Sequence, residues 1–153
     1  MTAWRRSLLL PRSVPKLKDD FSSLDEGTHS CYTFTESGKT WTENRNTCKG
    51  DGGDLVSMET EEEWQFINDE IQHRSIAYLN EYHIGLEKNG GDWTWINGGP
   101  LTISKWQVTH GEPSGDGDVA VMSKDYPPGT QGLFNDLPDY FKRAFICEMP
   151  RGT

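Results

Sequence analysis

Hydrophobic and polar positions follow two different periods along this chain, and the periods separate expected strands from expected helices. Residues 30–34, SCYTF, alternate as a short strand does. TWTE at 40–43 and TEEE at 60–63 both fit the S/T-x-x-E capping box, in which hydroxyl and carboxylate each bind an otherwise unpaired backbone N–H. The pattern predicts helices at about 41–50 and 61–73. The second helix places apolar residues on one face: Trp64, Ile67 and Ile71.

The second half of the chain is predicted to form strands that are separated by one long loop. Apolar runs predict strands at 82–86, 119–123, 132–136 and 144–149. Residues 87–118 carry turn signals dense enough to exclude a long helix. Because this segment is also rich in aromatic side chains, we expect an ordered functional loop packed by its own residues. Core packing, rather than stacking on a ligand, is expected for its tryptophans: Trp93, Trp95 and Trp106.

The length of the chain, 153 residues, suits one domain with its own core. We place a disordered leader or linker at residues 1–26, the folded domain at 27–150 and a tail at 151–153. The apolar run SLLL near the start is too short for a signal peptide, and an isoform-specific start is the alternative to a linker.

Charge and hydropathy restrict the class of partner. The net charge of −9 repels nucleic acid and anionic membrane surfaces, and it is compatible with cation binding. No apolar run approaches the roughly 18 residues that a membrane span requires. We therefore expect no nucleic-acid partner and no direct membrane insertion.

The chain shows no recognisable catalytic motif. It has no G-x-S-x-G elbow, H-E-x-x-H helix or glycine-rich phosphate loop. Its three cysteines form no CxxC pair and its four histidines are scattered, which argues against zinc. We expect no enzyme, and we expect His83 and His110 to be surface or partly buried residues rather than ligands. An odd number of cysteines means that at least one forms no disulfide within this chain.

One acidic stretch, WQVTHGEPSGDGD at 106–118, allows three interpretations: a metal site, a sugar site or an acidic surface loop. Calcium requires about six to eight oxygen ligands, preferably several carboxylates and amide carbonyls. The alternative for the stretch is a solvated loop. For Asn135 and Asp136 the alternative is an Asx turn that ends a strand.

The order of short motifs along the chain resembles that of the C-type lectin-like domain. The matching motifs are SCYTF, TWTENRNTCKGDGGDLVSMETEEEWQFI, HIGL, WTW, SKW, GEP, FND and FICE. The resemblance implies an α+β fold, in which two helices flank two small antiparallel sheets and a long loop carries the ligand site. It also implies a disulfide between Cys48 and Cys147. That bond implies an extracellular location, either secreted or in the ectodomain of a membrane protein.

The sequence departs from the family's pattern at two places that concern cysteine. The family's second core disulfide would join the positions of Val119 and Asp139, and neither is cysteine. Cys31 matches a cysteine that pairs with one further upstream in longer members, and no cysteine precedes it here. The resemblance leaves Cys31 as a thiol or bonded to a cysteine outside this chain.

The resemblance also implies a sugar-binding calcium site in the acidic stretch. Glu112, Asn135 and Asp136 match the family's ligands, and a cis peptide bond is expected between the glutamate and the following proline. Ser114 stands where the family has asparagine, and Asp116 is the carboxylate nearest to the position of the family's second glutamate. All five are candidate metal ligands; the same set without Asp116 is expected to bind the sugar. A Glu-Pro pair implies mannose, fucose or N-acetylglucosamine rather than galactose. The family's auxiliary calcium site would fall in EKNGGD, where the match is poor.

Three functions remain open. The first is an extracellular module of the C-type lectin kind that binds a glycan or glycoprotein through a weakened calcium site. The second is a calcium-independent protein-binding domain of a larger receptor or matrix protein, which uses the same long-loop face. The third is a hydrolase that acts through a metal in the acidic loop. Only the number of carboxylates supports it.

Overall fold

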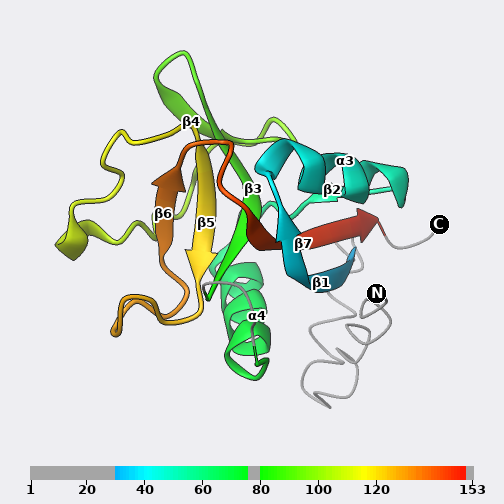
Figure 1. Cartoon of the computed structure of the whole chain (residues 1–153), viewed down its shortest axis with the longest axis horizontal. Helices are drawn as coiled ribbons and strands as arrows, with labels where there is room; N and C mark the ends of the chain where they lie inside the picture. The colour runs from blue at the N-terminus through cyan, green and yellow to red at the C-terminus, as the bar shows by residue number, and fades with distance from the viewer. Residues whose placement is uncertain (1–29, 76–79, 151–153) are drawn as a thin grey trace.

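The computed structural model describes residues 30–75 and 80–150, which form an α+β fold (Figure 1). Its helices are α3 (Trp41–Gly50) and α4 (Glu61–Gln72). Figure 1 shows them on different sides of the sheet, with α3 beside β7 and α4 beneath the ends of β3 and β5. The predicted leader at 1–26 and tail at 151–153 lie outside the described residues.

Both helices begin at the predicted capping boxes. Thr40 Oγ1 accepts the backbone N–H of Glu43 at 3.2 Å, while the Glu43 carboxylate accepts the N–H of Thr40 at 3.1 Å. Thr60 and Glu63 make the same reciprocal pair at the start of α4. The two predicted helices are confirmed, the first with the predicted bounds and the second one residue shorter.

The strands form one mixed sheet in the order β1-β7-β3-β5-β6, with β2 paired to β7 and β4 paired to β3. Their bounds are Ser30–Lys39 (β1), Asp54–Leu55 (β2), Glu81–Asn89 (β3), Asp92–Trp95 (β4), Val119–Ser123 (β5), Phe134–Leu137 (β6) and Arg143–Pro150 (β7). The expected fold class is confirmed. The two antiparallel groups, β1-β7-β2 and β4-β3-β5-β6, are joined by a short parallel pairing between β3 and β7.

The Cys48–Cys147 disulfide is present and links the end of α3 to β7. The two residues are 99 positions apart, so the bond closes most of the domain. Beside it lies a small apolar cluster on the α3 side of the sheet, while a larger cluster packs between the sheet and α4. Within the described residues, no helix is long and apolar enough to cross a membrane.

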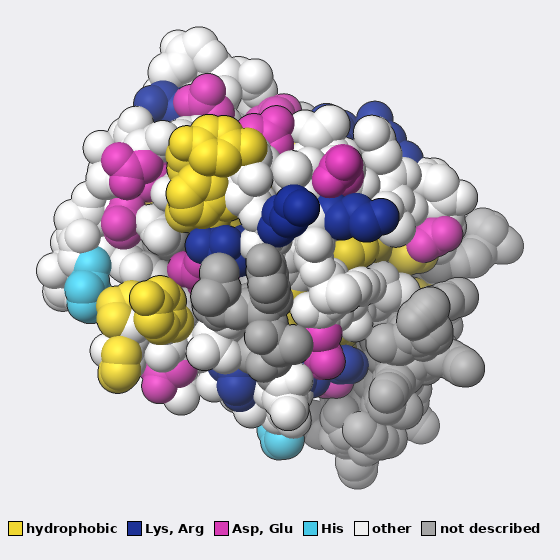
Figure 2. Space-filling model, viewed as in Figure 1, with side chains coloured by type: hydrophobic (Ala, Val, Ile, Leu, Met, Phe, Trp, Pro, Cys, Tyr) yellow, Lys and Arg dark blue, Asp and Glu magenta, His cyan; other side chains and the backbone are white. Residues whose placement is uncertain are grey.

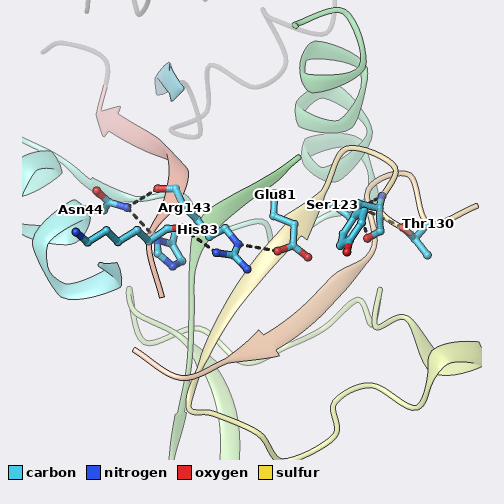
Figure 3. Close-up of polar contacts among 8 residues, drawn as sticks. Asn44, Glu81, His83, Ser123, Thr130 and Arg143 are labelled. Atoms are coloured by element: carbon cyan, nitrogen blue, oxygen red, sulfur yellow. Dashed lines mark hydrogen bonds and ion pairs between the residues drawn. The ribbon is translucent and has the colours of Figure 1, made fainter. Parts of the chain in front are cut away.

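A buried polar network ties α3 to β3 and β7 (Figure 3). The Asn44 amide donates to the Arg143 carbonyl at 3.0 Å, and its nitrogen lies 2.9 Å from His83 Nδ1. Arg143 Nε donates to the Glu81 carboxylate at 2.8 Å, and Arg143 Nη1 donates to the Lys142 carbonyl at 2.8 Å. The prediction for His83 was wrong, because this side chain is 0% exposed. Six consecutive residues of its strand, β3, are buried from Glu81 to Leu86, so both faces of this strand are covered.

Candidate functional site

The candidate site is the long loop, defined here as residues 96–118, which joins β4 to β5. Aromatic packing fixes its base. Trp106 bridges to Phe134 on β6, and its ring lies 4.9 Å from that of Trp93 and 6.0 Å from that of Phe134. Trp95 is 1% exposed and meets Phe134 edge-on. The predicted core role of the three tryptophans is confirmed.

The carboxylate of Asp136, on β6, lies beneath the turn of the loop and accepts its backbone N–H groups. Oδ1 accepts the Ser114 N–H at 2.9 Å and lies 3.4 Å from the Ser114 hydroxyl. Oδ2 accepts the N–H groups of Gly115 at 2.9 Å and Gly117 at 3.3 Å. Asp136 is 1% exposed. Both oxygens of this buried carboxylate are therefore engaged by the loop itself.

Glu112 lies next to Asp136 and shares one of its partners. Its Oε1 accepts the Ser114 N–H at 2.9 Å. Burial raises the pKa of Glu112, and its hydrogen bond with the Asp136 carboxylate raises it further. For Asp136, burial acts to raise the pKa, but the hydrogen bonds from Glu112 and from the loop N–H groups lower it overall. The two shifts separate the pKa values of the pair, so Asp136 keeps its negative charge to lower pH than Glu112 does.

The structure separates Asn135 from the rest of the predicted ligand set. Asn135 pairs with Val121 and Asp136 pairs with Ala120, so the two side chains point to opposite faces of the sheet. The Asn135 amide instead reaches the Glu81 carboxyl. Burial raises the pKa of Glu81, and the hydrogen bond from Asn135 acts to lower it. Glu112, Ser114 and Asp136 are brought together, whereas Asn135 is not.

The remaining features of the loop match expectation in part. The Glu112-Pro113 peptide bond is cis. Asp116 is exposed on the turn, between two glycines whose N–H groups point inward. His110 is exposed, at the end of the short helix η2 (Val108–His110).

This donor set does not fit the calcium site that the resemblance implies. A calcium ion needs about six to eight oxygen ligands, preferably ionised carboxylates with free lone pairs. Here Asp136 already accepts N–H groups with both oxygens, Glu112 has a raised pKa, and the Asn135 amide faces the other way. In the part of the chain that the structure describes, no three His, Cys, Asp or Glu side chains are grouped so that they could hold a metal ion.

The sequence of residues 37–149 matches the family described as Lectin C-type domain. The chain belongs to this family. Like other C-type lectin domains, it is a recognition module and not an enzyme. The family match covers both helices, the long loop and all strands except the first part of β1 and the last residue of β7.

Similar proteins and structures agree with this assignment. The human C-type lectin domain family 17, member A is 32% identical over 124 residues, which are 77% of this chain and 29% of that protein. The structure of the SPL-1–GlcNAc complex superposes with a TM-score of 0.70 at 25% identity, over 80% of this chain and 89% of that one. The Ca2+-independent C-type lectin SPL-2 from Saxidomus purpuratus gives a TM-score of 0.70 at 26% identity, over 81% and 88% of the two chains.

The curated relatives are longer proteins than this chain. The aligned region covers between 29% and 56% of their length. The match therefore concerns the lectin domain and leaves the rest of each relative without a counterpart here.

Proposed function

We propose that this C-type lectin domain binds neutral sugars through its long loop, and that it does so without a calcium ion. The observation that carries the proposal is the Asp136 carboxylate, which accepts the N–H groups of Ser114, Gly115 and Gly117 and so shapes the turn from within. In a calcium-dependent site an ion would organise such a turn. Here a buried negative charge performs that role, and the exposed side of the turn remains available to a ligand.

The groups on the exposed side suit hydroxyl-rich ligands. Ser114 and Asp116 are exposed, and Glu112 is half-buried beside them. A serine hydroxyl donates and accepts and a carboxylate accepts, so the turn offers both kinds of hydrogen-bond partner to a sugar. The Ca2+-independent lectin SPL-2 and the SPL-1–GlcNAc complex support this reading, since both are similar in structure to this chain. N-acetylglucosamine is therefore the first probe, followed by mannose and fucose.

The test compares sugar binding and thermal stability in millimolar calcium and in excess EDTA. We expect N-acetylglucosamine, mannose or fucose to bind with the same affinity in both, and Glu112→Ala to weaken binding equally in both. We also expect the thermal midpoint to be unchanged by calcium. An ion at 100 times its dissociation constant would stabilise the folded state by about 2.7 kcal/mol, which a midpoint shift would reveal. A thermal midpoint that rises in calcium, and no longer rises in Glu112→Ala, would contradict the proposal and indicate a calcium-assisted site.

A protein ligand is the second candidate, and Val108 favours it. This apolar side chain is 70% exposed in η2, on the same loop. Binding of the fluorescently labelled domain to cells, before and after enzymatic deglycosylation, separates the two candidates. Binding that survives deglycosylation and is lost in Val108→Asp would identify a protein surface. Binding that deglycosylation abolishes supports the sugar.

We further propose an extracellular location for the domain. The Cys48–Cys147 disulfide supports this, because such bonds persist in oxidising compartments. Isolated lectin sites bind single sugars weakly and gain strength from several copies, so a receptor or adhesion role would depend on how many such domains are displayed together.

A further inference from the structure

Tyr140 and Phe141 form an aromatic pair on the connection between β6 and β7, in which Tyr140 is exposed and Phe141 is partly buried. Tyr140 is 72% exposed, and its ring centroid lies 5.1 Å from that of Phe141 with 53° between the planes. Figure 1 shows this connection passing over the upper end of the sheet. In the same view, Figure 2 shows hydrophobic side chains gathered at the upper part of the molecule, with charged side chains of both signs nearby. Exposed tyrosines are enriched at recognition surfaces, where a rigid ring offers apolar area and a hydroxyl together.

The aromatic pair is held in place from below. The Arg143 guanidinium lies 5.4 Å from the centroid of the Phe141 ring, and its Nε donates to buried Glu81 at 2.8 Å (Figure 3). The Phe141 N–H donates to the Pro138 carbonyl at 3.3 Å. These side chains are therefore fixed before a ligand binds. Binding does not have to restrict their motion, which removes part of its entropic cost.

Charged residues of both signs lie next to the aromatic pair along the chain and across the sheet. Lys142 directly follows the pair, and Lys39 pairs with Arg143 across β1 and β7. Asp139 directly precedes the pair, and its carboxylate accepts a hydroxyl at 2.9 Å from the first turn of α3, which also carries Glu43. Ammonium groups donate and carboxylates accept hydrogen bonds, so these residues offer partners to a ligand with many hydroxyls.

The aromatic pair also shares a base with the long loop. Gly117 packs so closely against the backbone of Leu137 and Pro138 that a Cβ at this position would overlap it. Tyr140 follows Pro138 by two residues, and Leu137 pairs with Val119 where the long loop enters β5. The loop turn and the aromatic pair are thus carried by adjoining backbone at the end of the sheet.

We propose that Tyr140 and Phe141 form a second sugar subsite, on which the apolar face of a further pyranose of the same oligosaccharide stacks. Hydroxyls of that sugar bind Lys39, Lys142 and Glu43. The inference rests on the proposed sugar site in the long loop. It goes beyond that site by predicting oligosaccharide over monosaccharide preference, because two linked subsites raise affinity without any change in either one.

Tyr126 provides a matched control. It is also an exposed tyrosine, at 54%, but it lies on the connection between β5 and β6. That connection is fixed to the end of α4, where Gln72 Nε2 donates to the Lys124 carbonyl at 2.6 Å. It leaves β5 after Ser123, at the opposite end of the strand from Val119, where the long loop enters.

The experiment measures binding of N-acetylglucosamine and chitotriose, and of mannose and mannotriose, by residue-specific NMR and calorimetry on the whole chain. We expect one trisaccharide to bind about tenfold more tightly than its monosaccharide. It should shift the resonances of both Gly115 and Tyr140. Tyr140→Ser should remove the tenfold gain and leave monosaccharide affinity unchanged, while Tyr126→Ser should change neither. Equal thermal midpoints for the two variants would show that folding is not the cause.

Two negative results are distinguishable. If sugars shift the resonances of the long loop while Tyr140→Ser binds the trisaccharide as the unmodified protein does, the second subsite is refuted and the proposed function stands. If no sugar shifts any loop resonance, the proposed function fails and the subsite fails with it. Shifts at Tyr140 that appear only with a protein ligand would also overturn the sugar assignment.

Discussion

Asp136 and Ser114 are 22 positions apart in the sequence, yet the Asp136 carboxylate accepts the Ser114 backbone N–H at 2.9 Å and lies 3.4 Å from its hydroxyl. The same carboxylate holds the N–H groups of Gly115 and Gly117. The resemblance implies that β6 supplies metal ligands. Its Asp136 carboxylate instead accepts hydrogen bonds from the backbone of the loop. These hydrogen bonds shape the turn, and the proposal that it needs no calcium ion rests on them.

Asp136→Asn should loosen the turn. The amide leaves one oxygen and places an NH2 group against backbone donors, and hydrogen bonds to a buried charge contribute about 1.5 to 3 kcal/mol each. We expect the free energy of unfolding to fall by about 2 to 3 kcal/mol, measured by urea denaturation. Glu112→Gln is the matched control, since it removes one of two adjacent carboxyls and should cost little or add stability. A larger loss in Glu112→Gln than in Asp136→Asn would contradict the assignment of the charge to Asp136.

Gly117→Ala should disturb the same turn by a steric route. A Cβ there meets the backbone of Leu137 and Pro138, which cannot move without breaking the β5–β6 pairing. We expect a loss of about 1 to 3 kcal/mol and a loss of sugar affinity. Gly50→Ala is the control, because nothing lies within 4 Å of a Cβ at this helical position. Its stability should stay unchanged or rise by up to about 1 kcal/mol, because alanine is the better helix former. Equal effects in both variants would argue against close packing at Gly117.

The regular elements of this fold follow from local sequence signals. Both helices start where a threonine stands three residues before a glutamate, and the capping boxes form as predicted. β4 was missed because Asp92–Trp95 is short and lies among turn residues, so no apolar run marks it. It forms because it pairs with β3 across a tight turn at Gly90 and Gly91. The Gly90-Gly91 pair is a local signal for such a hairpin, and the prediction of one long loop from 87 to 118 did not use it.

The candidate site was predictable as a region but not as an arrangement. The Glu-Pro pair and the Asn-Asp pair indicated which segments meet, and Glu112 and Asp136 are indeed adjacent. The face on which each side chain lies depends on strand register, which places Asn135 towards Glu81 and Asp136 towards the loop. The hydrogen bonds from the loop N–H groups to Asp136 were also missed. Glycines at 115 and 117 were their only signal, and two glycines in an acidic loop indicate a turn without showing what it encloses.

Removal of the Cys48–Cys147 disulfide should destabilise the domain strongly. The bond spans 99 positions, and opening it frees the unfolded chain from a long closed loop. We expect the double variant Cys48→Ala, Cys147→Ala to lose about 2 to 5 kcal/mol in denaturant unfolding. Reduction of the unmodified protein should produce a loss of the same size. A reduced protein as stable as the oxidised one would show that packing alone holds the end of α3 against β7.

His83 should make the domain lose stability in mild acid. Burial, with a smaller contribution from the Arg143 charge, lowers the pKa of His83 from 6.5 to about 3. The folded state excludes a proton that the unfolded state binds. The free energy of unfolding therefore keeps its full value above about pH 6.5 and falls as the pH decreases towards 3. Protonation of Nδ1 would also remove the acceptor that faces the Asn44 amide nitrogen at 2.9 Å.

Several buried carboxyls act in the opposite direction. Burial raises the pKa of Glu81 and Glu148, so the folded state binds extra protons there and gains stability as the pH falls. The measurement must therefore be a difference between variants. Urea denaturation from about pH 7.5 to about pH 5 should show that His83→Gln loses the part of the slope due to this residue, up to about 1.4 kcal/mol per pH unit. The exposed His73, changed to Gln, should leave the slope unaltered. Parallel curves for His83→Gln and the unmodified protein would mean that His83 accepts its proton in the folded state, against the burial that the structure shows.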